Sequence, residues 1–138
     1  MKSILFASLL TVLSSTAWAA SLEVTVTEVR SDKGRVLVAL CSRGKFLADH
    51  CEYEQGVPAR AGSVVVRLDN VPPGVWAAQA YQDEDGNGEV TRNFLGLPTE
   101  GIGFSRDAPF RFGPPRFDDA AIQLGPQGGR ISLKLRYF

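Results

Sequence analysis

Histidine and cysteine are scarce in this sequence, with one His and two Cys among 138 residues. An excess of basic charge is also missing, because fifteen Lys and Arg residues balance fifteen Asp and Glu residues. Domains that bind nucleic acid normally carry a basic excess, so this class of function is disfavoured. The hydrophobic fraction of 44% is ordinary for a globular protein, and the length suits one domain.

Long hydrophobic runs are absent as well. The apolar run at residues 4–13 is about half the length of a membrane-spanning helix, which needs about 20 apolar residues. It follows Lys2 and precedes Ala17-Trp18-Ala19, an arrangement typical of a secretory signal peptide. We therefore predict that residues 1–19 are a signal peptide cleaved after Ala19. Residues 20–138 would form one exported domain, periplasmic or secreted, without a membrane span.

The two cysteines both lie in the predicted mature part. In an oxidising compartment Cys41 and Cys51 are expected to pair with each other. Their spacing matches no common zinc or redox motif, so metal binding and thiol catalysis are less favoured alternatives. His50, beside Cys51, has no free thiol to act on if the disulfide forms, and we expect it on the surface of the loop.

Helical periodicity is not convincing anywhere, and strand-like alternation dominates. In residues 22–27 the apolar side chains fall on one face, and in residues 130–137 they alternate again with Ile131, Leu133 and Leu135 facing inward. Turn residues separate such segments. The expected fold is an antiparallel, immunoglobulin-like or transthyretin-like β-sandwich of about seven strands. Its clear strands are residues 22–27, 35–41, 63–68, 75–81, 120–124 and 130–137.

One long segment, residues 83–119, lacks this alternation and is rich in Gly, Pro and Phe. Long loops of this kind are usually functional or disordered, and disordered segments are poor in aromatic residues. We therefore expect an ordered loop whose rings pack at the edge of the sandwich. Its arginines either join the rings in a binding surface or neutralise nearby acidic residues. The candidate partner surface comprises Phe94, Phe104, Arg106, Phe110, Arg111, Phe112, Arg116 and Phe117.

The sharpest local motif is the acidic turn that opens this segment. Asp83, Asp85 and Asn87 occupy positions 1, 3 and 5 of the calcium-loop pattern, and Gly88 and the Glu89 carbonyl would take positions 6 and 7. Alternating oxygen donors of this kind suit calcium, a hard cation. The competing hypothesis is a plain turn without metal, because Asp-Gly and Asn-Gly are favoured turn dipeptides.

The calcium-loop match is incomplete at position 12. Phe94 stands where an EF-hand supplies a bidentate Glu, so the turn is not an EF-hand. Glu100 or Asp107 folding back from the long loop would complete the site. The candidate calcium ligands are Asp83, Asp85, Asn87, Glu89 and Glu100.

Several blocks of the sequence resemble a known family. The blocks are residues 70–74, 80–88, 93–105 and 114–121. Together they resemble a family of small exported bacterial proteins catalogued as domain of unknown function 2141. The resemblance implies an immunoglobulin-like or transthyretin-like sandwich, and it implies no activity and no catalytic residue. Gln82 departs from the histidine that is common in the family before the acidic turn.

The function expected from these patterns is a non-catalytic binding module. It would contact a cell-envelope protein or glycan, and calcium is its one candidate cofactor. The alternative is a small cell-envelope hydrolase. Its acid and base would come from Glu84, Asp85, Glu89 or Glu100, although a sandwich of this size has little room for a deep cleft.

Overall fold

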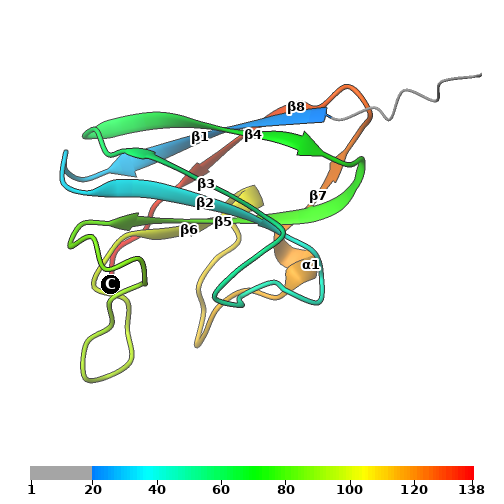
Figure 1. The fold of residues 1–138 in the computed structure, drawn as a ribbon. Helices are drawn as coiled ribbons and strands as arrows, with labels where there is room; N and C mark the ends of the chain where they lie inside the picture. The colour runs from blue at the N-terminus through cyan, green and yellow to red at the C-terminus, as the bar shows by residue number, and fades with distance from the viewer. Residues whose placement is uncertain (1–19) are drawn as a thin grey trace, which may run out of the picture.

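The computed structural model describes residues 20–138, so the predicted signal peptide, residues 1–19, lies outside the described residues. Two sheets face each other, which confirms the predicted sandwich (Figure 1). One sheet has the strand order β4-β1-β8; the other has β3-β2-β5-β6, with β7 also pairing with β5. The strands are β1 (Ala20–Val29), β2 (Arg35–Cys41), β3 (Tyr53–Pro58), β4 (Gly62–Val71), β5 (Gly74–Asp83), β6 (Ile102–Phe104), β7 (Ala121–Leu124) and β8 (Gly129–Lys134).

The core between the sheets follows the alternation in the sequence. Leu22, Val24 and Val26 of β1 are buried, and the residues between them are partly exposed. Leu133 of β8 and Leu40 of β2 reach the same core from the other strands. Burying a side chain of this size stabilises a fold by about 1.5–3 kcal/mol, so this layer is the main source of stability.

One pairing differs from the antiparallel arrangement expected. β8 runs parallel to β1, with Leu22 opposite Gly129 and Thr27 opposite Lys134. Inward and outward side chains alternate in the same way in parallel and antiparallel strands, so the alternation could not reveal the direction.

The predicted disulfide is confirmed. Cys41 ends β2 and Cys51 lies just before β3, with their Cα atoms 4.8 Å apart. His50 lies exposed beside the disulfide, 3.4 Å from a carboxylate oxygen of Glu54. The bond ties the connecting loop to the centre of the five-stranded sheet, because β2 lies between β3 and β5.

A second apolar cluster covers the outer face of the five-stranded sheet. It contains Phe104 and Phe117, each 7% exposed, and both make edge-to-face contacts with Phe46. These two rings were predicted in a partner surface, and that prediction is wrong because the sheet buries them. The expectation that rings of the long segment pack on the sandwich is confirmed for this pair.

The long segment is also less irregular than expected. It contains β6, the 3-10 turn η1 (Ser105–Asp107) and the short helix α1 (Phe117–Ala120). Within residues 20–138, no helix is long and apolar enough to cross a membrane.

Candidate metal centre

The acidic residues lie where β5 leaves the sheet and the chain returns to β6. These strands pair antiparallel, with Tyr81 opposite Ile102, and the Gln82 amide donates to the Gly101 carbonyl at 3.0 Å. Continuing this register by one step puts Asp83 opposite Glu100. The strand ladder therefore joins two carboxylates that are far apart in the sequence. We call residues 83–101 the acidic arm.

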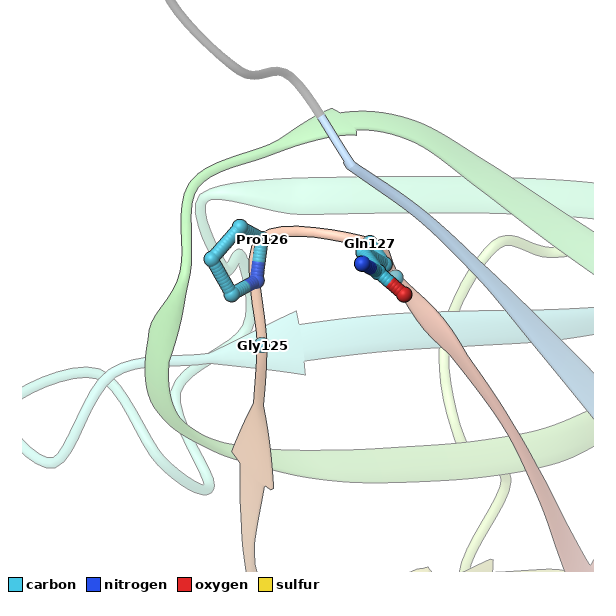
Figure 2. Close-up of a pocket in the computed structure, with 4 residues that line it drawn as sticks. Gly125, Pro126 and Gln127 are labelled. Atoms are coloured by element: carbon cyan, nitrogen blue, oxygen red, sulfur yellow. The ribbon is translucent and has the colours of Figure 1, made fainter.

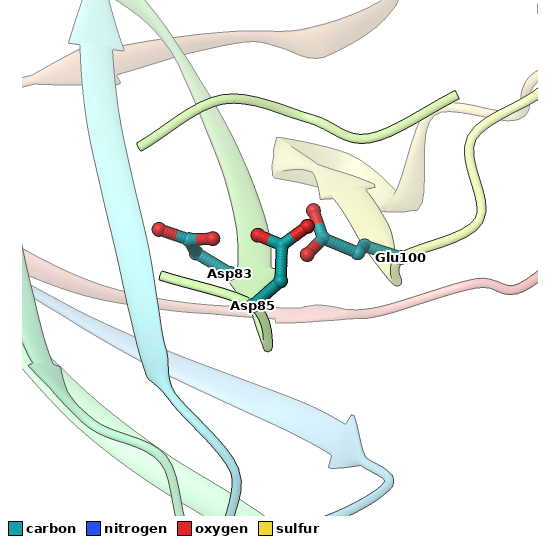
Figure 3. A group of neighbouring side chains, drawn as sticks. All are labelled: Asp83, Asp85 and Glu100. Atoms are coloured by element: carbon teal, nitrogen blue, oxygen red, sulfur yellow. The ribbon is translucent and has the colours of Figure 1, made fainter. Parts of the chain in front are cut away.

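Three carboxylates meet at the base of this arm. One oxygen each from Asp83, Asp85 and Glu100 lies within 4.8 Å of the other two, and Figure 3 shows the three groups turned toward one another. Asp83 and Glu100 are each only 4% exposed, whereas Asp85 is exposed. Two oxygens bound to one calcium ion lie at most about 5 Å apart, so the separation suits a shared ion.

Backbone amides of the arm hold the two buried carboxylates in place. Asp83 accepts hydrogen bonds from the amides of Asn87 at 3.2 Å and Gly88 at 2.9 Å. Glu100 accepts from the amides of Glu84 at 3.0 Å and Thr91 at 3.1 Å. Gly88 has a φ of 77°, a conformation that glycine adopts at little cost. The arm is thus folded around its acidic groups.

The β1–β2 turn supports this arrangement from behind. Gly34 packs so closely on the Asp83 carbonyl that a side chain there would collide with it. Gln82 is fully buried, and its Nε2 donates to the Ser31 carbonyl at 3.0 Å and the Lys33 carbonyl at 2.9 Å. Gln82 thereby fixes the turn, and among the described residues its Oε1 has no hydrogen-bond partner.

The protonation of the cluster is uneven. Burial raises the pKa of Glu100, and the nearby charge of Asp85 also acts to raise it. The pKa of Asp85 is lowered, first by the hydrogen bond from the Thr91 hydroxyl and then by the Asn87 amide. The environment thus favours the charged form of Asp85 and disfavours the charged form of Glu100.

Arg30 lies close to the cluster but pairs with Glu84. Arg30 Nε donates to Glu84 at 2.6 Å, and the Ser31 hydroxyl donates to the same carboxylate at 2.9 Å. Burial acts to raise the pKa of Glu84, but these two hydrogen bonds and the charges of Arg30 and Lys33 act the other way, and the pKa is lowered. Within residues 20–138, Asp83, Asp85 and Glu100 take part in no ion pair.

A depression of about 330 Å³ lies beside the cluster; its lining comprises Arg30, Lys33, Glu84, Asp85, Thr91, Thr99 and Glu100. A second hollow, of about 590 Å³, lies at the β7–β8 turn, where Gly125, Pro126, Gln127 and Gly128 line it (Figure 2). The second hollow has no charged lining residue, so the charged groups that could bind a ligand line the first hollow.

The structure brings together three of the five predicted calcium ligands, namely Asp83, Asp85 and Glu100. Asn87 uses its side-chain amide within the turn, where Oδ1 accepts from the Glu89 amide and Nδ2 donates to Thr91. The Glu89 side chain is exposed outside the cluster. The carboxylate of Asp107, the alternative to Glu100, accepts from the Lys134 amide at 2.9 Å instead.

The remaining residues of the predicted partner surface are spread over two loops. Phe94 is 96% exposed in the acidic arm, and Phe112 is fully exposed between η1 and α1. Phe110 is half-buried, with its ring centroid 5.0 Å from that of Phe138. The three arginines of this set, Arg106, Arg111 and Arg116, are exposed.

The alternative role for these arginines, neutralising acidic neighbours, applies to only part of the set. Arg116 pairs with Asp119 at 3.5 Å, and Arg106 donates to the backbone carbonyl of Asp118 at 3.2 Å. Arg111 has no ion pair among the described residues.

Comparison with known proteins agrees with the resemblance. No curated protein and no solved structure matches the chain. A family model described as "Uncharacterized protein conserved in bacteria (DUF2141)" matches residues 24–132, which takes in most of β1 to β8 and the whole acidic arm. The chain therefore belongs to the DUF2141 family of uncharacterised conserved bacterial proteins.

Proposed function

We propose that this protein is an exported, non-catalytic binding module that holds calcium at the acidic arm and contacts a component of the cell envelope. The observation that carries the proposal is the convergence of Asp83, Asp85 and Glu100 within 4.8 Å, two of them buried. Carboxylates that are buried without a positive partner are costly, and a bound divalent cation removes that cost.

The chemistry of the donors favours calcium over other ions. All three side chains offer oxygen, and the cluster contains no sulfur or imidazole that would suit zinc. Calcium accepts six to eight oxygens in flexible geometry, which suits a cluster with one exposed member, Asp85. Magnesium demands a tighter octahedron and is expected to bind more weakly.

Export is supported by two features. The first is the Ala-x-Ala signal after a short apolar run at residues 4–13. The second is the Cys41–Cys51 disulfide, a bond that persists in oxidising compartments.

Thermal unfolding with calcium and with chelator tests the proposal. At a calcium concentration of 100 times the Kd, the free energy of unfolding should rise by about 2.7 kcal/mol. Asp83→Asn should abolish the increase. Asp69→Asn, which changes an exposed carboxylate on β4 in the other sheet, should keep it. An unchanged melting temperature of the unmodified protein in calcium would rule the site out.

A hydrolase remains the second candidate, because one observation favours it. The pKa of Glu100 is raised and that of Asp85 is lowered, the pattern of a general acid beside a charged carboxylate. Any hydrolytic activity found in a substrate screen should fall at least about a hundredfold in Glu100→Gln if Glu100 is the acid. Activity that survives in both Glu100→Gln and Asp85→Asn would exclude these roles.

A further inference from the structure

The acidic arm ends in an exposed apolar tip, residues 93–97. Phe94 is 96% exposed and Leu95 is 69% exposed, and Leu97 beside them is also exposed. Single exposed apolar residues are common on proteins, but two adjacent large ones at the end of a protruding loop leave contiguous apolar surface in water. Such a surface indicates a binding role.

Hydrogen bonds keep this tip in one conformation. The Asn93 side chain accepts from the amides of Leu95 at 2.9 Å and Leu97 at 3.1 Å, and the Asn93 amide donates to the Leu97 carbonyl at 2.9 Å. Arg92 pairs with Pro98 as a β-bridge below the tip. Because these bonds already order the turn, Phe94 and Leu95 are presented without a large further loss of conformational entropy on binding.

A second loop, residues 108–116, repeats this combination. Phe112 at its end is fully exposed, and the neighbouring Arg111 is exposed as well. Figure 1 shows the segment between β5 and β6 and the segment between β6 and α1 extending from the same side of the five-stranded sheet, away from β4, β1 and β8. The two apolar ends thus project on one side of the molecule.

Positive charge accompanies both apolar ends. Arg92 and Arg111 are exposed, and among the described residues neither makes an ion pair with a carboxylate. Arg92 Nη1 donates to the Gly96 carbonyl at 3.1 Å, so its charge stays beside the tip. An aromatic ring next to an arginine suits a boundary where apolar chains meet phosphate groups.

We infer that the partner is an anionic lipid surface, contacted by the Phe94 tip and the Phe112 loop. Both ends are convex, and a bilayer accepts a protruding apolar group without a matching pocket, which a protein partner would have to provide. Lipid phosphates attract the unpaired guanidinium groups of Arg92 and Arg111. This inference rests on the proposed function, because Asp83, Asp85 and Glu100 would repel an anionic surface until a calcium ion offsets most of their charge.

Vesicle co-sedimentation tests the inference. The purified protein is mixed with vesicles of phosphatidylcholine, with or without phosphatidylglycerol, in calcium or in chelator. We expect pelleting only with phosphatidylglycerol and calcium. Phe94→Asp should weaken vesicle binding by about ten- to hundredfold, the value of burying one large apolar side chain. Val65→Asp, which changes an exposed apolar residue on β4, is the matched control and should bind normally.

A fluorescent variant gives a second measurement that does not depend on a destabilising charge. Phe94→Trp places an indole at the tip, and its emission should shift to shorter wavelength when anionic vesicles and calcium are both present. Val65→Trp places an indole at an exposed apolar position on β4, in the other sheet, and its emission should not shift.

Calcium binding is measured separately by calorimetry, so that failure of the lipid inference can be distinguished from failure of the calcium site. Calcium binding without vesicle binding overturns the lipid inference and leaves the calcium site standing. Vesicle binding that is equal in calcium and chelator, with no calorimetric signal, supports the lipid surface and overturns the calcium site. If vesicles of both compositions leave the protein in solution while Phe94→Asp abolishes self-association in sedimentation, the tip joins two copies of this chain and the lipid inference is wrong.

Discussion

The sandwich and the acidic arm arrange their side chains in opposite ways. Between the sheets, apolar residues such as Leu22 and Leu133 are buried and charged residues face water. In the arm, the apolar Phe94 is 96% exposed, while the adjoining carboxylates of Asp83 and Glu100 are 4% exposed. Hydrophobic burial therefore explains the shape of the sandwich, but the arm takes its shape from hydrogen bonds to carboxylates. A region with buried carboxylates and exposed apolar side chains is better suited to binding a partner than to stabilising the fold.

Phe104 and Phe94 offer the sharpest test of this contrast, and the larger effect is expected for Phe104. Phe104 is 7% exposed and packs on Phe46, so Phe104→Ala should lower the free energy of unfolding by about 3–5 kcal/mol. Urea unfolding followed by circular dichroism measures the change. A loss below about 1 kcal/mol would mean that the outer cluster contributes little to the fold.

The disulfide is expected to matter next. Replacing both cysteines by alanine, in Cys41→Ala/Cys51→Ala, should lower the free energy of unfolding by about 2–4 kcal/mol, because the open loop gains freedom in the unfolded state. Denaturant melts with and without reductant compare the two forms. The unmodified protein should lose a similar amount in reductant, whereas the double variant should not respond to it.

Within the arm, replacing Asp83 should lower the free energy of unfolding the most. Asp83→Ala removes the acceptor of the Asn87 and Gly88 amides, and losing buried hydrogen-bonded groups costs about 1–3 kcal/mol. Amide hydrogen exchange should accelerate at Asn87 and Gly88 and stay slow in β1. Slow exchange throughout the arm would show that other contacts hold it.

The buried Glu100 gives the arm a distinct response to pH. Because its folded-state pKa is raised, it stabilises the fold below its unfolded pKa of about 4.3, and this contribution is lost as the pH rises through the raised value. In chelator, the unmodified protein should therefore lose stability relative to Glu100→Gln as the pH rises from about 4.3 through the raised pKa of Glu100.

Glu52 provides a control of opposite sign. Hydrogen bonds from the Ser42 hydroxyl and amide lower its pKa, so its contribution is present above the unfolded pKa and is lost as the pH falls through the lowered value. The unmodified protein should gain stability relative to Glu52→Gln as the pH rises from the lowered pKa of Glu52 to its unfolded value of about 4.3, and the difference should stay constant above it. Thermal melts at several pH values compare the variants, and parallel curves for both would contradict the assignments.

The smallest effect on stability is expected for the counterpart of Phe104. Phe94→Ala should change the free energy of unfolding by less than about 0.5 kcal/mol, because the ring contacts water in the folded state. The same urea experiment serves for both variants. A loss comparable to that of Phe104→Ala would show that the tip packs against the sandwich and is not available to a partner.

The sequence could predict those parts of the fold in which one face of a strand meets the core. The alternation in β1 and β8 identified Leu22 and Leu133 as inward residues, and both are buried. Two strands were missed. β3 carries Glu54, Gln55 and Gly56 because it lies at the edge of its sheet, and β6 has only three residues, all buried, so neither alternates.

The candidate site could be predicted only where its residues are close together in the sequence. The spacing of Asp83 and Asp85 follows a known loop pattern, and Glu100 was one of two residues considered for a third ligand. Only the pairing of β5 with β6 decides between Glu100 and Asp107, and that pairing depends on a strand too short to recognise. The burial of Phe104 and the exposure of Phe94 also depend on which segments pack against the sheet. The amino-acid composition of a segment does not show whether it packs there.

The parallel contact between β1 and β8 has a consequence for the order of events during folding. The Thr27 hydroxyl and the Leu133 carbonyl are joined by a hydrogen bond although 106 positions separate them. An emerging polypeptide cannot cover that flank of β1 until nearly all of it is available, and ladders of such long range form slowly. Newly made molecules should therefore stay unfolded longer than their size suggests. If the protein is exported as proposed, this delay would help it, because only an unfolded chain fits a narrow translocation pore.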